Sequence, residues 1–387
     1  MIGIRADANS IIATGHMMRC LTIAREIVRQ GESVTFFMAD DESKKLFTSF
    51  SGENEFKTVV LGSDYRNMEG ELDLLEKELK AAGVGALLVD SYSVTTGYFE
   101  RLSKICKVAY LDDLAKEAYR VDLLINYSGY SENMGYDKLY SSHIAAGRRE
   151  TKLLLGLKYA PLREQFYRGN IDKDSDIMNN SGKEAGAQHK PVNLLFATGG
   201  GDMCNMITDV LDRAMAEGLI PGDSKSNKDD SSLMSSHENV IWHVVVGDFV
   251  ENPEVIDSYA KEYDNIILHR SVKNMADLMR KCDIAVLAAG TMLTECAACG
   301  LPSIFYQVAD NQKYNVEYFG ALKGMIFAGD VHSGSVSKEA TIGRIFEELK
   351  RLLADKSMMK SMGESLLEIT DGRGAVRIAR ALMDEIV

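Results

Sequence analysis

The sequence predicts two consecutive α/β domains, each built on a Rossmann-like, doubly wound parallel sheet, that face each other across a cleft. Short apolar runs alternate with amphipathic stretches in both halves of the chain, and such alternation is typical of a parallel sheet with helices on both faces. The alternation stops once, at a polar tract rich in Gly, Ser and Asp, and then restarts. A length of 387 residues is comfortable for two domains.

The first domain is predicted to span residues 1–168. Helical spacing marks residues 71–83 and 97–106, and a further helix begins close to Gly15. That helix carries an apolar stripe expected to pack on the sheet, formed by Met17, Cys20, Leu21, Ala24, Ile27 and Val28. The strands of this domain are predicted at apolar runs rich in Val, Leu and Ile, which are residues 2–7, 33–40, 57–62, 86–92, 107–113 and 122–128.

Residues 169–190 are predicted to form a linker or a disordered insertion, because they are polar and lack periodicity. The second domain is predicted over residues 191–387, with a disordered surface loop at 222–238 and a final amphipathic helix at 373–387. The strands of this domain are expected at residues 192–200, 241–249, 265–270, 283–290, 302–308 and 325–329.

Composition excludes several classes of protein. The net charge of −13 argues against nucleic-acid binding, because a phosphate backbone is gripped by basic surfaces. No apolar run approaches the roughly 20 residues that span a membrane, and the N-terminus lacks the regions of a signal peptide. We therefore expect a cytoplasmic protein without stable membrane association.

The six cysteines give no sign of a metal or redox site. They are scattered along the chain, and the CxxC formed by Cys296 and Cys299 lies in a helical pattern with no second pair at zinc spacing. We expect them to be buried as small apolar side chains. The sequence thus predicts no metal and no cofactor.

In doubly wound sheets, ligands bind outside the carboxyl ends of the strands. In the second domain this rule selects the loops that follow Phe196, Val246, His269 and Ala288. In the first domain it selects polar side chains at predicted strand ends, which are Asp7, Asp90, Tyr92, Asp112 and Asn126.

His16 and Arg19 lie off the apolar stripe of the first helix, three residues apart on one face. A histidine in the first turn of a helix feels the positive end of the helix dipole, which favours the neutral imidazole that a general base needs. The alternative is a histidine that only bonds to the backbone of the preceding loop. Spacing alone does not decide between the two.

Two glycine-rich turns are candidates for binding phosphate. Gly199, Gly200 and Gly201, followed by Asp202, come after a predicted strand and before a helix, where the backbone can approach an anion closely. A tight structural turn is the alternative. The second turn, at Gly290 and Thr291, opens a helix that carries Glu295, and this carboxylate is suited to two ribose hydroxyls or, alternatively, is only a solvated charge.

The N-terminal pattern of Arg5, Asp7, Gly15, His16 and Arg19 resembles the motif of the UDP-sugar hydrolases of pseudaminic acid biosynthesis, which are grouped with spore-coat polysaccharide proteins. The pattern departs from the family at Ala13-Thr14, where a glycine usually stands two residues before Gly15. Further matches are VDSY at 89–92, YLDD at 110–113, GLKYAPLREQF at 156–166, the glycines with Asp202, the 290–295 stretch, and DGRGAVRI at 371–378.

This resemblance implies the two-domain GT-B fold and the hydrolysis of UDP-2,4-diacetamido-2,4,6-trideoxy-β-L-altropyranose. It implies that His16 activates the water that attacks the anomeric carbon, with inversion and release of UDP, and that no metal takes part. Tyr92 is implied to position the sugar and Glu295 to bind the ribose. The diphosphate is implied to lie at residues 199–202 and 290–291.

The remaining substrate contacts predicted on this basis are Asp7, Gly15, Arg19, Arg163, Asn311 and Gln312. The resemblance leaves open whether Asp7 and Asp112 act on the substrate or only shape the site. It alone suggests the sugar, and the sequence gives no oligomeric state.

A GT-B glycosyltransferase, which hands the sugar from UDP to an acceptor in place of water, is the main alternative. Both enzymes need a UDP site and a base, so sequence separates them poorly. A catalytically silent binding protein for nucleotide-sugars is a second alternative. A nicotinamide-dependent oxidoreductase is disfavoured, because the GxGxxG fingerprint and its acidic partner are missing.

Overall fold

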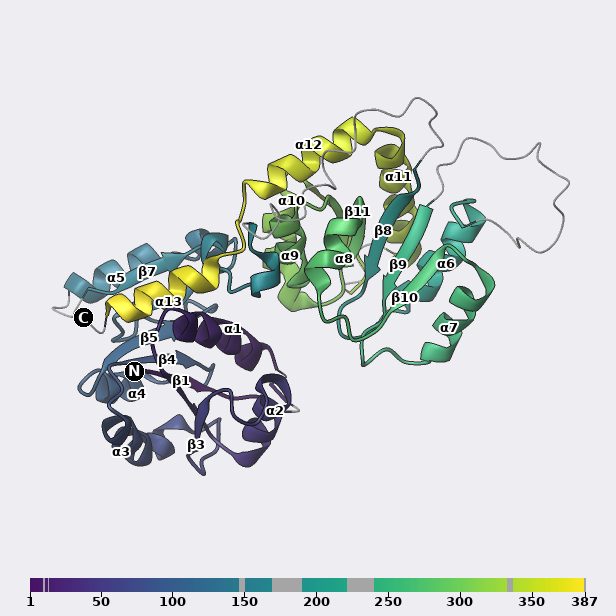
Figure 1. Cartoon of the computed structure of the whole chain (residues 1–387). Coiled ribbons are helices and arrows are strands. Elements are labelled where there is room, and N and C mark those ends of the chain that lie inside the picture. The colour runs from purple at the N-terminus through teal and green to yellow at the C-terminus, as the bar shows by residue number, and fades with distance from the viewer. Residues whose placement is uncertain are drawn as a thin grey trace, which may run out of the picture. The chain divides into compact units, whose positions relative to one another are not determined.

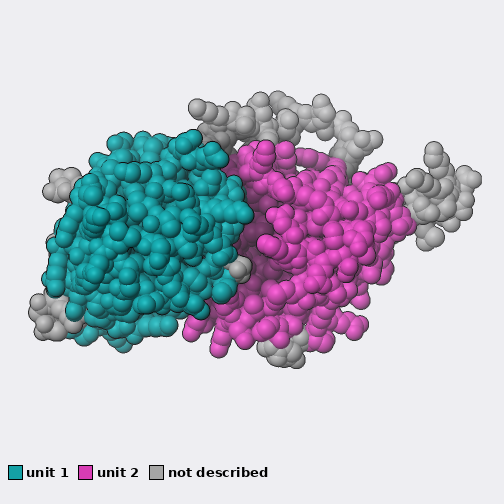
Figure 2. Space-filling model, turned by 90° about the horizontal axis from the view of Figure 1, so that it is seen from below, with its two compact units in different colours: residues 1–164, 372–387 teal, residues 165–371 magenta. Residues whose placement is uncertain are grey.

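The computed structural model describes residues 1–9, 11–12, 14–145, 150–168, 190–220, 240–332 and 337–385. The chain divides into two compact units (Figure 2), of which unit 1 comprises residues 1–164 and 372–387 and unit 2 comprises residues 165–371. The predicted linker lies, except for Lys190, outside the described residues, as does the predicted loop at 222–238.

Unit 1 is built on a seven-stranded parallel sheet in the order β3-β2-β1-β4-β5-β6-β7. The strands are β1 (Ile2–Ala6), β2 (Val34–Met38), β3 (Lys57–Val60), β4 (Ala86–Asp90), β5 (Lys107–Leu111), β6 (Leu123–Asn126) and β7 (Lys152–Leu155). The helices are α1 (Gly15–Arg29), α2 (Asp41–Ser51), α3 (Leu72–Ala82), α4 (Thr96–Leu102), α5 (Tyr136–Ala145) and α13 (Gly374–Asp384), with short 3-10 turns at Met68–Glu71, Ser131–Met134 and Leu157–Tyr159. A further 3-10 turn, Glu164–Phe166, begins at the last residue of this segment of unit 1 and continues into unit 2.

The sheet of unit 1 is apolar on both faces. Phe36 and Phe37, adjacent in β2, are both fully buried but belong to different clusters, because successive side chains of a strand point to opposite faces. One cluster holds α1 and α13, and the other holds α3 and α4 (Figure 1). The predicted stripe of α1 is buried except for Val28, which is 48% exposed.

Unit 2 is built on a six-stranded parallel sheet in the order β10-β9-β8-β11-β12-β13. The strands are β8 (Val192–Ala197), β9 (Val240–Val245), β10 (Ile266–His269), β11 (Ile284–Ala288), β12 (Ser303–Gln307) and β13 (Met325–Asp330). The helices are α6 (Met206–Ala216), α7 (Pro253–Glu262), α8 (Met275–Lys281), α9 (Met292–Cys299), α10 (Lys313–Gly320), α11 (Lys338–Ala354) and α12 (Lys356–Leu367), with a 3-10 turn at Asp310–Gln312.

The prediction of two doubly wound domains is confirmed, since both sheets follow the strand order of a Rossmann fold. In each sheet the direction of winding reverses between the first and fourth strands of the unit. These are β1 and β4 in unit 1, and β8 and β11 in unit 2. In doubly wound sheets, ligands bind outside the carboxyl ends of the strands at such a reversal.

The C-terminal helix differs from its predicted assignment. Residues 372–387 were predicted to belong to the second domain, whereas α13 packs against α1 in unit 1. Its apolar residues Ala375, Ile378, Ala379 and Leu382 are fully buried in the same cluster as the stripe of α1. At its first residue, Gly374, a Cβ atom would lie 2.1 Å from the carbonyl oxygen of Ala160.

We predict that Gly374→Ala destabilises the protein by about 1–3 kcal/mol, because the added methyl group meets backbone atoms that must move. Gly343→Ala is the matched control, since Gly343 lies inside α11 with open space around its Cα. The control should stabilise the protein by about 0.5–1 kcal/mol. The measurement is the free energy of unfolding in urea, and equal effects at the two sites would contradict the packing of α13.

Candidate active site

A histidine–aspartate pair lies at the point where the winding of the unit 1 sheet reverses. His16 is in the first turn of α1, and Asp90 is the last residue of β4. Asp90 pairs in register with Ala6 at the end of β1, so the strand order brings the start of α1 to the carboxylate. Nδ1 of His16 is 2.6 Å from Oδ1 of Asp90, and both side chains are buried.

The charge on Asp90 decides which ring nitrogen of His16 carries the proton. Burial alone would raise the pKa of Asp90, but Arg19 and His16 lower it to about 2, so the carboxyl is ionised at neutral pH. An ionised carboxylate only accepts hydrogen bonds. Nδ1 of His16 must therefore carry a proton and donate it, so the neutral form of the imidazole has its lone pair on Nε2, where it can act as a base.

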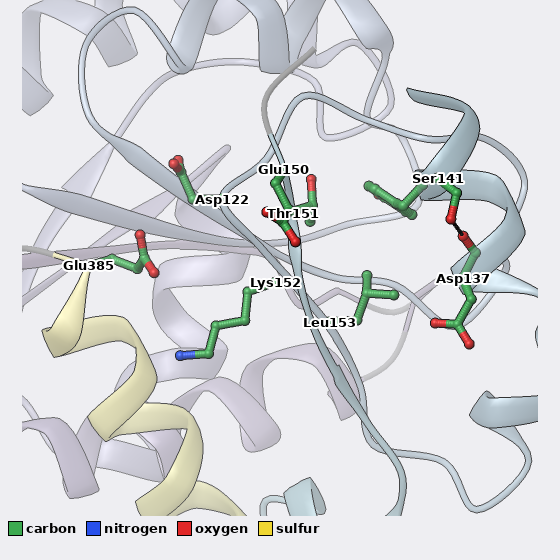
Figure 3. Close-up of a pocket in the computed structure, with 9 residues that line it drawn as sticks. Asp122, Asp137, Ser141, Glu150, Thr151, Lys152, Leu153 and Glu385 are labelled. Carbon is green, nitrogen blue, oxygen red and sulfur yellow. Dashed lines mark hydrogen bonds between the residues drawn. The ribbon is translucent and has the colours of Figure 1, made fainter. Parts of the chain in front are cut away.

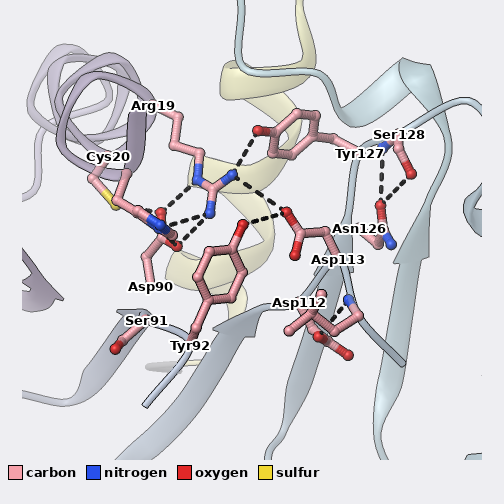
Figure 4. Close-up of polar contacts among 12 residues, drawn as sticks. Arg19, Cys20, Asp90, Ser91, Tyr92, Asp112, Asp113, Asn126, Tyr127 and Ser128 are labelled. Atoms are coloured by element: carbon pink, nitrogen blue, oxygen red, sulfur yellow. Dashed lines mark hydrogen bonds and ion pairs between the residues drawn. The ribbon is translucent and has the colours of Figure 1, made fainter. Parts of the chain in front are cut away.

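Arg19 holds Asp90 in place. Its Nε and Nη2 atoms donate to the two oxygens of Asp90 at 2.5 Å each, and its Nη1 donates to the hydroxyl of Tyr127 at 2.8 Å (Figure 4). Nη2 also lies 2.9 Å from Nδ1 of His16, but two donors cannot bond to each other. The sequence predicted Arg19 as a substrate contact, and the structure directs its guanidinium to Asp90 and Tyr127.

Tyr92 and Asp113 lie next to the pair. The ring of Tyr92 meets the ring of His16 edge to face, with centroids 4.8 Å apart, and its hydroxyl donates to Oδ2 of Asp113 at 2.9 Å. The same oxygen is 4.0 Å from Nη1 of Arg19. Tyr92 is half exposed, so its ring is available to contact a ligand that binds next to His16.

Asp7, also predicted as a substrate contact, is 2% exposed and both of its oxygens are engaged within the protein. Oδ2 pairs with Nη1 of Arg5 at 2.5 Å, and Oδ1 accepts from the backbone N–H of Ala39 at 2.7 Å. Arg5 also makes a bidentate ion pair with Glu71. The structure therefore gives Asp7 the role of fixing the end of β1 beneath the site.

Two other residues of unit 1 were predicted to contact the substrate. Gly15 is the first residue of α1, and a Cβ atom there would have open space. Arg163 is half-buried and lies between the 3-10 turns at Leu157–Tyr159 and Glu164–Phe166.

In unit 2 the loop of Gly199, Gly200 and Gly201 follows β8, as predicted, but Asp202 already occupies the start of the next helix. Its two carboxylate oxygens accept from the N–H groups of Met206 and Ile207 at 2.8 Å each. A diphosphate would have to compete with this carboxylate for the first N–H groups of α6. The loop is packed closely on its neighbour, since a Cβ at Gly247 would lie 2.4 Å from the carbonyl oxygen of Gly200.

The turn at Gly290 and Thr291 is more open to an anion. It follows β11 and begins α9, whose first turn has no side-chain cap and carries Glu295, which is half-buried. Uncapped N–H groups at a helix start attract phosphate. Asn311 and Gln312 lie in the 3-10 turn after β12, where Asn311 is exposed and Oε1 of Gln312 accepts from the N–H of Val308.

The structure thus brings His16, Arg19 and Tyr92 together in unit 1, and places the two glycine turns at the reversal point of the sheet in unit 2. It adds Asp90, Asp113 and Tyr127 to the group around His16. Asp90 was already selected by the strand-end rule. The other two directly follow Asp112 and Asn126, which the same rule selected, so extending it by one residue would have found them.

A cavity of about 560 Å³ opens elsewhere in unit 1 (Figure 3). It lies where β6 and β7 begin, at the opposite edge of the sheet from His16, and its lining includes Asp122, Asp137, Glu150 and Glu385. Four carboxylates would repel a diphosphate. The nucleotide-sugar chemistry expected from the sequence therefore does not fit this cavity.

Within the described part of the chain, no cluster of three or more His, Cys, Asp or Glu side chains could hold a metal ion. None of its helices is both long and apolar enough to cross a bilayer.

Comparison with known proteins finds distant relatives of the chain. No protein-family model matches the chain. It is 21% identical to the spore coat polysaccharide biosynthesis protein SpsG of Bacillus subtilis over 392 aligned positions, covering 99% of this chain and 98% of that protein. It is 24% identical to the uncharacterized protein MJ1062 of Methanocaldococcus jannaschii over 311 residues, and spans about half (54%) of that protein's length.

Solved structures share the fold across nearly the whole chain. MurG of Acinetobacter baumannii superposes with a TM-score of 0.60 at 11% identity, covering 99% of both chains. The calicheamicin glycosyltransferase CalG4 has a TM-score of 0.57 at 13% identity, covering 99% of this chain and 98% of its own. A putative UDP-N-acetylglucosamine 2-epimerase of Listeria monocytogenes has a TM-score of 0.55 at 11% identity, covering 99% and 96%. The two-domain fold predicted from the sequence is thus shared with glycosyltransferases.

The role of Asp7 can be tested by stability. We predict that Asp7→Asn lowers the free energy of unfolding by about 3–5 kcal/mol, because it breaks a buried ion pair and turns an amide N–H toward existing donors. The matched control is Asp64→Asn, whose exposed pair with Arg66 should contribute almost nothing. An Asp7→Asn protein as stable as the control would return Asp7 to the list of substrate contacts.

Proposed function

We propose that this protein hydrolyses a UDP-sugar to UDP and the free sugar, with His16 as the general base. The observation that carries the proposal is the pair of His16 and Asp90, because an ionised, buried carboxylate on Nδ1 leaves Nε2 as a base beside a half-exposed aromatic ring. The similarity to SpsG over the length of both chains supports a role in polysaccharide biosynthesis.

In the proposed reaction Nε2 of His16 removes a proton from a water molecule as the water oxygen attacks the anomeric carbon. The bond between that carbon and the oxygen of the β-phosphate breaks, and its electron pair stays on the phosphate. UDP leaves, and the configuration at the anomeric carbon is inverted. A general base of this kind contributes about 10²–10⁴-fold to the rate, and Asp90 stabilises the imidazolium that forms.

We place the diphosphate at Gly290 and Thr291, with Glu295 at the ribose. The uncapped start of α9 favours negative charge, including the charge that develops on the leaving phosphate. The loop of Gly199, Gly200 and Gly201 is the second proposed contact, in which the exposed Gly199 and Gly200 let the backbone approach a ligand. The sugar suggested by the family resemblance is the 2,4-diacetamido-2,4,6-trideoxy-β-L-altropyranose.

A UDP-sugar-dependent glycosyltransferase is the second candidate. MurG and CalG4, which share the fold, favour it. The two reactions differ in one reactant only, since the proton removed by His16 comes from an acceptor hydroxyl in a transferase and from water in a hydrolase.

We predict that the wild-type protein releases UDP from UDP-2,4-diacetamido-2,4,6-trideoxy-β-L-altropyranose without any acceptor or added metal. His16→Ala should lower kcat by about 10²–10⁴-fold because the base is lost. Asp90→Asn should also lower kcat, by up to about 10⁴-fold, because a neutral amide no longer selects the Nδ1–H form of His16. Both variants should still bind UDP, and the measurement is UDP release over a panel of UDP-sugars.

Two results would change the assignment. UDP release that begins only when an acceptor is added would identify a transferase. A His16→Ala protein with the activity of the wild type would remove His16 from the chemistry of either reaction.

A further inference from the structure

Asp113 is a second carboxylate beside His16, and the function proposed above does not use it. It follows β5, and its Oδ2 atom accepts the hydroxyl of Tyr92 and faces Arg19 (Figure 4). Its other oxygen, Oδ1, is shielded from solvent and has no hydrogen-bond partner. Among the described residues, this is the one carboxylate oxygen in that condition.

An unpaired buried acceptor is costly. Leaving a buried polar group without its hydrogen bond costs about 1–3 kcal/mol, and more for a charged group. The neighbouring Asp112 shows the ordinary arrangement, since its two oxygens accept from the N–H groups of Leu114 and Ala115 and from the hydroxyl of Tyr136. In the loop after β5, both carboxylate oxygens of Asp112 accept hydrogen bonds, whereas only one oxygen of Asp113 does.

The unpaired oxygen can be reached by a small movement. The Asp113 side chain as a whole is 32% exposed, and the torsion about its Cβ–Cγ bond is broad. A rotation can therefore turn Oδ1 outward, although it also moves Oδ2 relative to the hydroxyl of Tyr92. The hydroxyl of Tyr92 donates its hydrogen bond to Asp113, and its oxygen keeps lone pairs that can accept hydrogen bonds. Together the two residues therefore offer acceptors, and no donor, to a ligand next to His16.

We propose that Asp113 is a specificity-determining residue that accepts a hydrogen bond from a hydroxyl or N–H group on the sugar of the bound nucleotide-sugar. This inference rests on the proposed function, because the reacting carbon of the sugar must lie at His16. A site built to accept such a bond rejects analogues that lack the donor, since the carboxylate is then left buried and unpaired. Sugars that are deoxygenated at the contacted position are therefore excluded.

The test is equilibrium binding of UDP-2,4-diacetamido-2,4,6-trideoxy-β-L-altropyranose and of UDP alone, measured by calorimetry in a His16→Gln background that keeps the sugar nucleotide intact. Asp113→Asn should weaken binding of the sugar nucleotide by about 10–100-fold, the value of one hydrogen bond to a charged group. Binding of UDP, which lacks the sugar on the β-phosphate that would contact Asp113, should stay within about twofold. The Tm of Asp113→Asn should not fall, because the substitution removes a charge that has an unpaired oxygen.

Glu117→Gln is the matched control, since it removes the same charge from an exposed position of the same loop. It should change neither affinity. Equal losses for both ligands in Asp113→Asn, accompanied by a lower Tm, would show a structural role and overturn the proposal, as would unchanged affinity for the sugar nucleotide. A His16→Gln protein that binds UDP but no member of the UDP-sugar panel would count against the proposed function itself, and the inference would fall with it.

Discussion

The bidentate ion pair between Arg19 and Asp90 is the interaction on which the arrangement of the site depends. Burying a carboxylate costs several kcal/mol of stability unless the carboxylate is paired and hydrogen-bonded. Asp90 meets this condition, because it accepts hydrogen bonds from Nε and Nη2 of Arg19 and from Nδ1 of His16. The pairing keeps Asp90 ionised, and the ionised carboxylate in turn selects the Nδ1–H form of His16. Since Arg19 and His16 lie three residues apart on α1, the same contact also fixes the helix against the end of β4.

Topology supplies the positions that this chemistry needs. Because the sheet of unit 1 reverses its winding between β1 and β4, the loop after β1 and the end of β4 lie side by side, although His16 and Asp90 are 74 residues apart in sequence. The ion pairs of Arg5 with Asp7 and Glu71 hold the end of β1 beneath them. Unit 2 repeats the arrangement, with one glycine turn after β8 and another after β11, at its own point of reversal.

Much of this was predictable from the sequence, and the exceptions have physical reasons. Of the thirteen strands in the described part of the chain, twelve were expected from their apolar runs. Strand β7 was missed because its apolar run consists only of the three leucines at 153–155, which do not favour a strand over a helix. Helix α13 was assigned to the wrong unit, since an amphipathic pattern shows that a helix packs but not on which sheet. The base at His16 was expected, but its partner Asp90 and the inward roles of Asp7 and Arg19 depend on pairings between distant segments that periodicity does not encode. The sequence could not show that Oδ1 of Asp113 lacks a hydrogen-bond donor, because this depends on the positions of all the surrounding donors in the folded protein.

The central claim is that Asp90 selects the tautomer of His16 in which Nδ1 carries the proton and Nε2 carries the lone pair. Nitrogen-15 NMR of histidine-labelled protein at neutral pH tests it directly, with the signals of His16 identified among the seven histidines by their loss in His16→Gln. The account predicts a protonated, pyrrole-type Nδ1 and an unprotonated, pyridine-type Nε2, and predicts that this preference is lost in Asp90→Asn. A proton on Nε2 in the wild-type protein would contradict it, because His16 would then have no lone pair to offer on that nitrogen.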